Sequence, residues 1–326
     1  MQVPLVIGLV TILGISSLSS EFEKDLLLLS SRAASSRNYP TAGAIANAVN
    51  LKHQEYGLSL TVQSRRSSAS LMRRIMPGEL LLAEVLQARV YKAHKGQGDG
   101  MGHPKSDLCS VFNTHAEYIT LIVPTDTGIT SIKELAGRRV AVGSPGTDLH
   151  ASVVDILTAV GINYETDLTA IDQRLETFPD LLRDGEVDAF FWPVEKMSRP
   201  LAELMSGARK IRAVPIAAAE IDALVAADPF YEKAVVRLTL NTALSQTGLI
   251  EALGVKMSLV ASCDMPEREV YRVTKATFER LEALRKINPT ISLMSFEAMV
   301  KNLPSPVHPG AMTYYRESGL NPTLRP

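Results

Sequence analysis

The stretch from 138 to 161 limits the possible folds of this chain more than any other. Residues 139–143 form a short apolar run rich in β-branched side chains, and residues 144–148 (Ser-Pro-Gly-Thr-Asp) have the composition of a turn. Apolar side chains then recur at helical steps, and a glycine closes the pattern where a C-terminal cap belongs. Thr147 or Asp148 is the expected N-cap, because a side-chain oxygen there satisfies a free backbone N–H. The stretch predicts a strand, a tight turn and a helix, the unit of an α/β fold.

This turn has two interpretations. The free N–H groups and the positive end of the helix dipole attract anions. That attraction is only about 0.3–1 kcal/mol, so an ordinary connection between a strand and a helix explains the turn without any ligand. The sequence has no glycine-rich phosphate fingerprint, so a nucleotide is not the first expectation.

The composition is that of a globular protein with enough apolar residues for two hydrophobic cores. The chain has 326 residues, of which 46% are hydrophobic, and its formal net charge is −1. This charge balance gives no indication of a nucleic-acid partner. Cys109 and Cys263 show no metal-ligand spacing and no CxxC motif. Whether they pair depends on the fold, and so few cysteines suit either the cytosol or a bacterial periplasm.

Residues 1–20 have features of a secretory signal peptide. Residues 3–15 are almost wholly apolar, too short a run to span a bilayer, which takes about 20 residues. Residues 16–20 (Ser-Ser-Leu-Ser-Ser) fit a small-residue cleavage zone. No lysine or arginine precedes Lys24, so the usual basic region is missing, and a buried N-terminal strand is the alternative. We expect export to the periplasm with cleavage near residues 17–20.

The first hundred residues alternate between strand and helix patterns. Strands are expected at 24–29, 58–63 and 80–86, with helices between them, the first of which is capped by Thr41. The alternation predicts a parallel sheet, and ligands of such sheets bind at the carboxyl ends of the strands. The loops at those ends are 30–39 and 64–68.

The middle of the chain repeats this plan. A strand at 118–123 and a short helix with a capping box at 131–134 precede the strand–turn–helix stretch. A returning strand at 254–261 completes a second α/β unit, and helices from 266 to 286 and around 311–318 follow. The other expected elements are helices at 178–182, 200–205 and 220–227 and strands at 187–192 and 211–216.

Segments spread along the chain resemble the TAXI-type solute-binding proteins of TRAP transporters. They occur in the same order as in that family and cover the chain after the signal. The tail segment and the segment at 134–162 are together the most specific. The segments are Asn38–Asn50 (NYPTAGAIANAVN), Glu134–Ile162 (ELAGRRVAVGSPGTDLHASVVDILTAVGI), Leu181–Pro193 (LLRDGEVDAFFWP), Gly254–Pro289 and Ser305–Leu320 (SPVHPGAMTYYRESGL).

The resemblance implies an α/β protein of the two-lobed, type II periplasmic-binding-protein architecture. Each lobe is expected to be a mainly parallel sheet flanked by helices, with lobe one at 24–117 plus 258–326 and lobe two at 118–257. Such a protein closes about a hinge on a small organic acid or amino acid and delivers it to a TRAP-type membrane permease. No cofactor and no catalysis are implied, and the sequence has no G-x-S-x-G nucleophile elbow. The family's ligand-holding loops correspond to 30–39, 64–68, 86–88, 143–148 and 190–196.

Four of these loops differ from the family pattern: the first two, the one at 86–88, and the one at 143–148, where Asp148 replaces a glycine or polar residue. Where the family has glycines, this chain has Arg32 in the first loop and Arg66 in the second. Guanidinium groups near a solute would bind a carboxylate through charge-assisted hydrogen bonds of about 1.5–3 kcal/mol each. They predict a dicarboxylate or an acidic amino acid as the ligand; the alternative is a divergent binding or sensory module whose ligand site is altered or lost. The predicted ligand-binding residues are Ser31, Arg32, Ser35, Tyr39, Ser64, Arg66, Ser67, Ser68, Gln87, Ser144, Gly146, Thr147, Asp148 and Trp192.

Several of these residues also have purely structural interpretations. Asp148 is most simply a helix N-cap, and its carboxylate would repel an anion. Trp192, the sole tryptophan, can fill a core, and Tyr39 can pack without touching a ligand. His308 is expected to be a structural turn residue, and the spacing of the histidines indicates no metal site.

Overall fold

The structure, a computed structural model, describes most of the chain. The predicted export signal lies outside the described residues. Within them, no helix combines the length and the apolar character needed to cross a membrane. The described residues are 26–32, 38–65, 67–75, 81–97, 106–193, 199–216, 218–228, 230–237, 249–287, 291 and 294–325.

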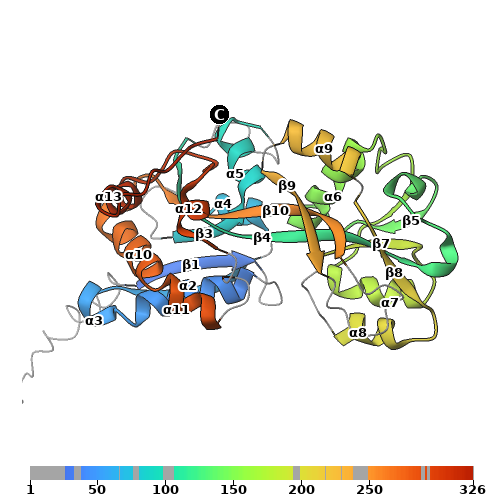
Figure 1. The fold of residues 1–326 in the computed structure, drawn as a ribbon, viewed down its shortest axis with the longest axis horizontal. Coiled ribbons are helices and arrows are strands. Elements are labelled where there is room, and N and C mark those ends of the chain that lie inside the picture. The colour runs from blue at the N-terminus through green and yellow to red at the C-terminus, as the bar shows by residue number, and fades with distance from the viewer. Residues whose placement is uncertain are drawn as a thin grey trace, which may run out of the picture.

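A parallel sheet forms what we call the first half of the molecule, at the left of Figure 1. Its strands are β1 (Leu26–Arg32), β2 (Ser59–Arg65) and β3 (Leu81–Leu86), and its helices are α2 (Asn38–Asn50), α3 (His53–Tyr56), α4 (Ser68–Met72) and α5 (Gln87–His94). β1 lies between β2 and β3 and is parallel to both, which confirms the predicted alternation. The predicted cap at Thr41 is wrong, because α2 already begins at Asn38. The sequence pattern also missed α5, which follows β3 without an intervening turn.

A second group of parallel strands forms the second half, at the right of Figure 1. β5 pairs in parallel with β6 and β7, and α6 has Thr147 as its N-cap, one of the two residues predicted. The predicted capping box at 131–134 is wrong, because the Ser131 side chain makes no cap and Glu134 instead accepts a hydrogen bond from the Thr130 N–H at 2.7 Å. The elements are β5 (Arg139–Ala141), α6 (Asp148–Ala159), β6 (Thr169–Ile171), α7 (Phe178–Arg183), β7 (Ala189–Pro193), α8 (Arg199–Ser206), β8 (Ile211–Val214), α9 (Ala218–Ala227) and the 3₁₀ helices η1 (Thr125–Thr127), η2 (Ile132–Leu135) and η3 (Leu175–Thr177).

Two long antiparallel strands run through both halves. β4 (Leu108–Pro124) and β10 (Leu249–Ser262) pair with each other along most of their length, and Figure 1 shows them passing from the left group of elements to the right group. Together they make one sheet in the order β2-β1-β3-β10-β4-β7-β5-β6. The sequence predicted only the last part of β4, at 118–123, and most of β10, at 254–261. β9 (Tyr231–Arg237), which pairs with β10, was not predicted.

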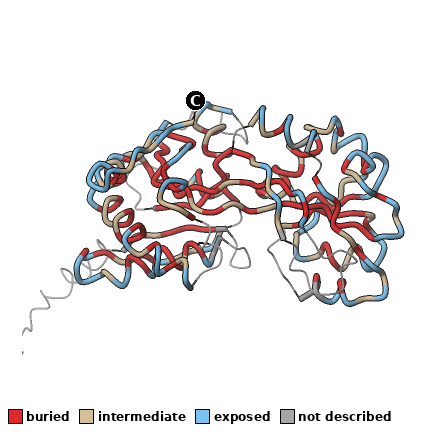
Figure 2. The backbone as a smooth tube through the Cα atoms, viewed as in Figure 1, coloured by how far each residue is buried: buried red, intermediate tan, exposed pale blue. Residues whose placement is uncertain are grey.

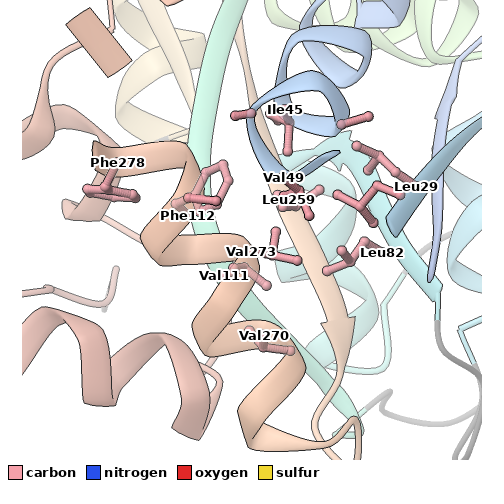
Figure 3. Close-up of a cluster of buried hydrophobic side chains, with 14 of the residues drawn as sticks. Leu29, Ile45, Val49, Leu82, Val111, Phe112, Leu259, Val270, Val273 and Phe278 are labelled. Carbon is pink, nitrogen blue, oxygen red and sulfur yellow. The ribbon is translucent and has the colours of Figure 1, made fainter. Parts of the chain in front are cut away.

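Each half has its own hydrophobic cores. In the first half, β1, β3, β4 and β10 pack against α2 and the C-terminal helix α10 (Glu267–Glu279), and Figure 3 shows Leu29, Val49, Phe112 and Val273 meeting there. In the second half, separate clusters lie against α6 on one face of the sheet and against α7 and α8 on the other. Figure 2 shows the buried residues concentrated along the strands, with exposed residues on the outer helices and loops.

The C-terminal segment completes the first half. The single helix predicted from 266 to 286 is two helices, because α10 ends before Arg280. His308 is fully buried, and its Nδ1 accepts a hydrogen bond from the Gly310 N–H at 3.1 Å, which confirms its structural role. Burial lowers the pKa of His308. Gly310 is required because a Cβ there would lie 2.1 Å from the Glu267 carbonyl oxygen. The remaining helices are α11 (Leu281–Ile287), α12 (Phe296–Val300) and α13 (Pro309–Glu317).

A disulfide joins Cys109, near the start of β4, to Cys263, just after the end of β10. These strand ends are neighbours in the sheet, since Ala261 pairs with Cys109. The Cα atoms are 5.0 Å apart although the residues are separated by 154 positions. The link therefore closes the part of the chain that contains the whole second half.

Candidate functional site

Buried polar side chains lie where the core of one half ends and the core of the other begins. On β3, Leu82 belongs to a core of the first half and Leu86 to a core of the second, and the fully buried Glu84 lies between them. On β4, residues 113–117 (Asn-Thr-His-Ala-Glu) separate the core residues of the two halves. Burying polar groups is costly unless they are hydrogen-bonded. A group of buried polar side chains between two apolar cores therefore indicates a functional role, and this junction is the candidate site.

Glu84 is held unequally at its two oxygens. Its Oε1 accepts a hydrogen bond from the Thr114 hydroxyl at 2.7 Å and lies 3.3 Å from His115 Nδ1. Its Oε2 is 3.4 Å from the Ser31 hydroxyl, which is long for an O–H···O hydrogen bond. The three partners come from β1 and β4, the strands on either side of the β3–β10 pair in the sheet.

An irregularity in β4 brings Thr114 and His115 to the same carboxylate. Lys256 pairs with Ala116 and Ser258 pairs with Asn113, so Thr114 and His115 together face one residue of β10. Successive side chains of a regular strand point to opposite faces, whereas a bulge re-aims one of them. The extra residue therefore lets two consecutive side chains reach Glu84.

His115 also reaches helix α2. Its Nδ1 lies 3.4 Å from the hydroxyl of Thr41, which is fully buried in the first turn of that helix. When Nδ1 carries a proton, the imidazole donates it toward Glu84, because the carboxylate can only accept. We call Ser31, Thr41, Glu84, Thr114 and His115 the Glu84 cluster.

A second buried carboxylate joins the two halves directly. Asp148, at the start of α6, accepts hydrogen bonds from the Ser68 hydroxyl at 2.9 Å and from the Ser68 N–H at 3.2 Å. The same hydroxyl accepts a hydrogen bond from the Leu86 N–H at 3.0 Å. Asp148 is therefore not the N-cap of α6; Thr147 is, through a bond of 3.3 Å from the His150 N–H. Three of the predicted loops, 64–68, 86–88 and 143–148, thus meet at one place.

Other predicted residues lie beside this contact. Ser67 is buried and caps α4 by accepting a hydrogen bond from the Ser70 N–H at 3.3 Å. The buried side chain of Gln87 donates to the Met257 carbonyl at 3.3 Å. Both side chains thus make structural hydrogen bonds within the junction.

The remaining predicted residues are placed apart or are not described. Ser64 and Gly146 are exposed, and Ser144 is half-buried, with its carbonyl accepting from Thr147. Trp192 is fully buried in a core of the second half against Phe190, which favours the packing interpretation over a ligand contact. Arg32 ends β1 and Tyr39 lies in the first turn of α2, but their side chains are outside the described part, as are Ser35 and Arg66 entirely.

Sequence reasoning missed Thr41, Glu84, Thr114 and His115 as site residues. One signal was available: Glu84 is the only charged residue in the apolar run LLAEVL at 81–86. A charge in the middle of a buried strand indicates either a paired structural group or a binding site.

Charged groups make a further contact between the halves. Lys92 of α5 lies 3.4 Å from Asp155 of α6 and 3.7 Å from Asp228, and the Tyr231 hydroxyl donates to Asp155 at 2.7 Å. Burial raises the pKa of Asp228, Asp155 adds to this rise, and Lys92 opposes it. Burial and the charge of Asp155 also raise the pKa of Tyr231.

Solved structures of periplasmic proteins share this fold. The periplasmic binding protein BugD is 12% identical, with a TM-score of 0.53 over 91% of this chain and 99% of that one. MatC from Rhodopseudomonas palustris, solved with bound malate, is 14% identical, with a TM-score of 0.52 over 82% and 88%. A structure described as a periplasmic transporter is 17% identical, with a TM-score of 0.50 over 80% and 85%. At these identities the likeness shows the fold alone.

The sequence itself matches a family. The match to the NMT1-like family runs over residues 31–319 and so includes both halves and the junction between them. The narrower TAXI-type group, expected from the sequence segments, stays a prediction. The chain belongs to the NMT1-like family, and its fold is that of the periplasmic binding proteins.

Proposed function

We propose that this protein is an extracytoplasmic solute-binding protein that holds a small solute at the junction of its two halves. The observation that carries the proposal is the buried polar group between two separate cores. A carboxylate, an imidazole and several hydroxyls in one buried place supply the few directed polar contacts that fix a small ligand. The fold supports this function, and MatC, which shares it, was solved with malate.

In this proposal the two halves act as lobes, at 24–117 plus 258–326 and at 118–257. The long strands β4 and β10 link them, and the bulged segment near Thr114 is one of two places where their regular pairing is interrupted. Closure about such strands requires only a few backbone dihedrals to change. A solute that touches both halves favours the closed arrangement in proportion to its greater affinity for it.

The partner we propose is a TRAP-type membrane permease, as the TAXI resemblance implies, with this protein in the periplasm. The disulfide between Cys109 and Cys263 supports that location, because disulfides form and persist mainly in oxidising compartments. The protein would act by binding and delivery, without catalysis.

The TAXI resemblance implies a small organic acid or an amino acid as the solute, and the two arginines favour a dicarboxylate or an acidic amino acid. Arg32 and Arg66 are the groups expected to bind its carboxylate. The contrary candidate, a module whose ligand site is lost, is favoured by one observation, namely that Ser68 and Asp148 already hydrogen-bond across the junction. In a module that binds no ligand, the hydrogen bond between Ser68 and Asp148 would stay formed at all times.

A ligand screen followed by scattering tests the proposal. Amino acids, dicarboxylates, primary amines and alkanesulfonates are first screened for a rise in melting temperature, since a ligand at 100 times its dissociation constant adds about 2.7 kcal/mol. Small-angle scattering with the best compound should then show a smaller radius of gyration. Binding without any change in radius would exclude hinge closure, and a screen in which no class binds would favour the lost-site module.

A further inference from the structure

We propose that the Glu84 cluster is an amine-binding subsite, so that the solute carries a protonated amine held by the Glu84 carboxylate. This inference rests on the proposed function and names the ligand class within it. It separates an acidic amino acid from a dicarboxylate without an amine, the two classes that the sequence left as alternatives.

The position of Glu84 is the first step of the argument. Its side chain lies on β3 between Leu82 and Leu86, which belong to cores of different halves. An apolar side chain there would continue the apolar surface, and replacing a buried charged group and its partners by apolar residues is often neutral or stabilising. A fully buried carboxylate at this point therefore calls for a role that an apolar residue could not fill.

The local backbone is shaped around this carboxylate. The bulge in β4 directs both Thr114 and His115 to Oε1, and a regular strand would direct only one of them. Oε1 is thereby held from two sides, while Oε2 has the long 3.4 Å contact with the Ser31 hydroxyl. Among the described residues, the orientation of the carboxylate is fixed through Oε1, and Oε2 has only the long contact with Ser31.

Hydrogen-bond chemistry then selects the ligand group. A protonated primary amine has three N–H donors and no acceptor, which suits a carboxylate oxygen surrounded by hydroxyls. Ser31 can rotate its hydroxyl from donating to Glu84 to accepting from the amine, and the Thr41 hydroxyl is a further acceptor in the cluster. A solute carboxylate placed here would meet like charge, which disfavours at this subsite a dicarboxylate that has no amine.

The position of the Glu84 cluster in the sheet also supports an amine-binding subsite. Ser31 lies at the carboxyl end of β1, and Glu84 lies two positions before the carboxyl end of the parallel strand β3. Ligands of open α/β sheets bind at these ends.

The test compares matched solutes that differ only in the amine. The best amine-bearing compound of the screen and its hydroxy analogue, for example L-glutamate and 2-hydroxyglutarate, are titrated by calorimetry into the full chain and into Glu84→Gln. We expect the hydroxy analogue to bind the wild type at least about tenfold more weakly than the amine. In Glu84→Gln, the amine should lose roughly thirtyfold in affinity and its analogue less than about threefold, because only the amine uses the charge.

A matched variant controls for the loss of a buried carboxylate. Glu269→Gln removes another buried carboxylate of the first half, one that pairs with Arg268 and Arg272 on α10, and should leave both affinities unchanged. Far-ultraviolet circular dichroism and the melting temperature establish that each variant is folded. If Glu84→Gln does not fold, Ser31→Ala takes its place, and it should weaken the amine about threefold by removing one acceptor.

The outcomes separate this inference from the proposed function. Equal or tighter binding of the hydroxy analogue, or of a dicarboxylate that lacks an amine, would overturn the amine subsite while upholding a solute-binding protein. If the amine binds Glu84→Gln as tightly as it binds the wild type, the amine subsite is likewise overturned and the solute-binding function is upheld. Failure of every solute class to bind would contradict the proposed function, and the inference with it.

Discussion

The two halves of the molecule are braced in different ways. In the first half, a disulfide joins β4 to the end of β10, and the C-terminal helices pack on the same sheet. Beyond the shared strands, the second half meets the first through the ring contact of Tyr91 with Phe230, whose centroids are 5.0 Å apart, and through two polar contacts in which α6 takes part. One is the buried bond between Ser68 and Asp148, and the other is the partly exposed set of Lys92, Asp155 and Asp228.

The difference indicates which half is the platform and which half moves. A covalent link and a continuous core resist local opening, whereas a few hydrogen bonds and ion pairs contribute little each and can be exchanged for water. We therefore expect the second half to move about the first, with the junction as the place where contacts break and re-form.

Removing the disulfide should have the largest effect on stability. Cys109→Ser with Cys263→Ser opens a link between residues 154 positions apart, and we expect the free energy of unfolding to fall by about 3–5 kcal/mol. Urea denaturation measures this loss. Hydrogen exchange should show greater loss of protection in the first-half ends of β4 and β10 than in β5 and β7. Equal loss of protection in both halves would contradict the inference that the disulfide braces mainly the first half.

Removing the buried junction carboxylate should have the next largest effect. Asp148→Ala leaves the N–H and the hydroxyl of Ser68 without this acceptor, at a cost of about 2–3 kcal/mol in the free energy of unfolding. Asp148→Asn keeps one acceptor oxygen and should lose less. If thermal and urea unfolding of Asp148→Ala match the wild type, the contact between the halves is already open in solution.

The charged contact should respond to pH with a defined sign. Burial raises the pKa of Asp228 above its usual value of 3.8, so the folded state holds this proton more tightly than the unfolded state. The contribution of Asp228 to stability is therefore most favourable below pH 3.8 and declines as pH rises through the raised pKa. Asp228→Asn, which cannot ionise, should gain stability relative to the wild type between pH 4 and pH 7. A relative loss over that interval would show that the ion pair with Lys92 outweighs burial.

Removing the lysine of this contact should have the smallest effect. Lys92 and Asp155 keep 31% and 28% of their side-chain surface exposed, so their ion pair contributes only about 0.5 kcal/mol. Lys92→Met keeps much of the aliphatic stem, and its difference from the wild type should shrink in about 0.5 M salt because exposed charges are screened. If the stability difference between Lys92→Met and the wild type does not change with salt, the Lys92 contact is shielded from solvent as the Ser68–Asp148 bond is.

The sequence predicted local structure better than long strands. The turn and helix of α6 were correct because their capping and apolar spacing are local properties. β4 was predicted only at 118–123, because polar residues such as Thr114 and His115 interrupt its apolar pattern although the strand continues through them. Their polarity belongs to the junction between two cores, which no local pattern reveals.

The sequence by itself determined the α/β order, the start of α6 with its cap at Thr147 or Asp148, and the loops that gather at the carboxyl ends of the first strands. The tertiary structure alone decided that Cys109 pairs with Cys263, that Asp148 binds Ser68 and that Glu84 is enclosed by Ser31, Thr114 and His115. Partners such as Cys109 and Cys263, or Ser68 and Asp148, are separated by 154 and 80 positions, so strand order and register bring them together. A single extra residue in β4 then changes which side chains face the carboxylate, and pairing of this kind depends on the neighbouring strand rather than on the local sequence.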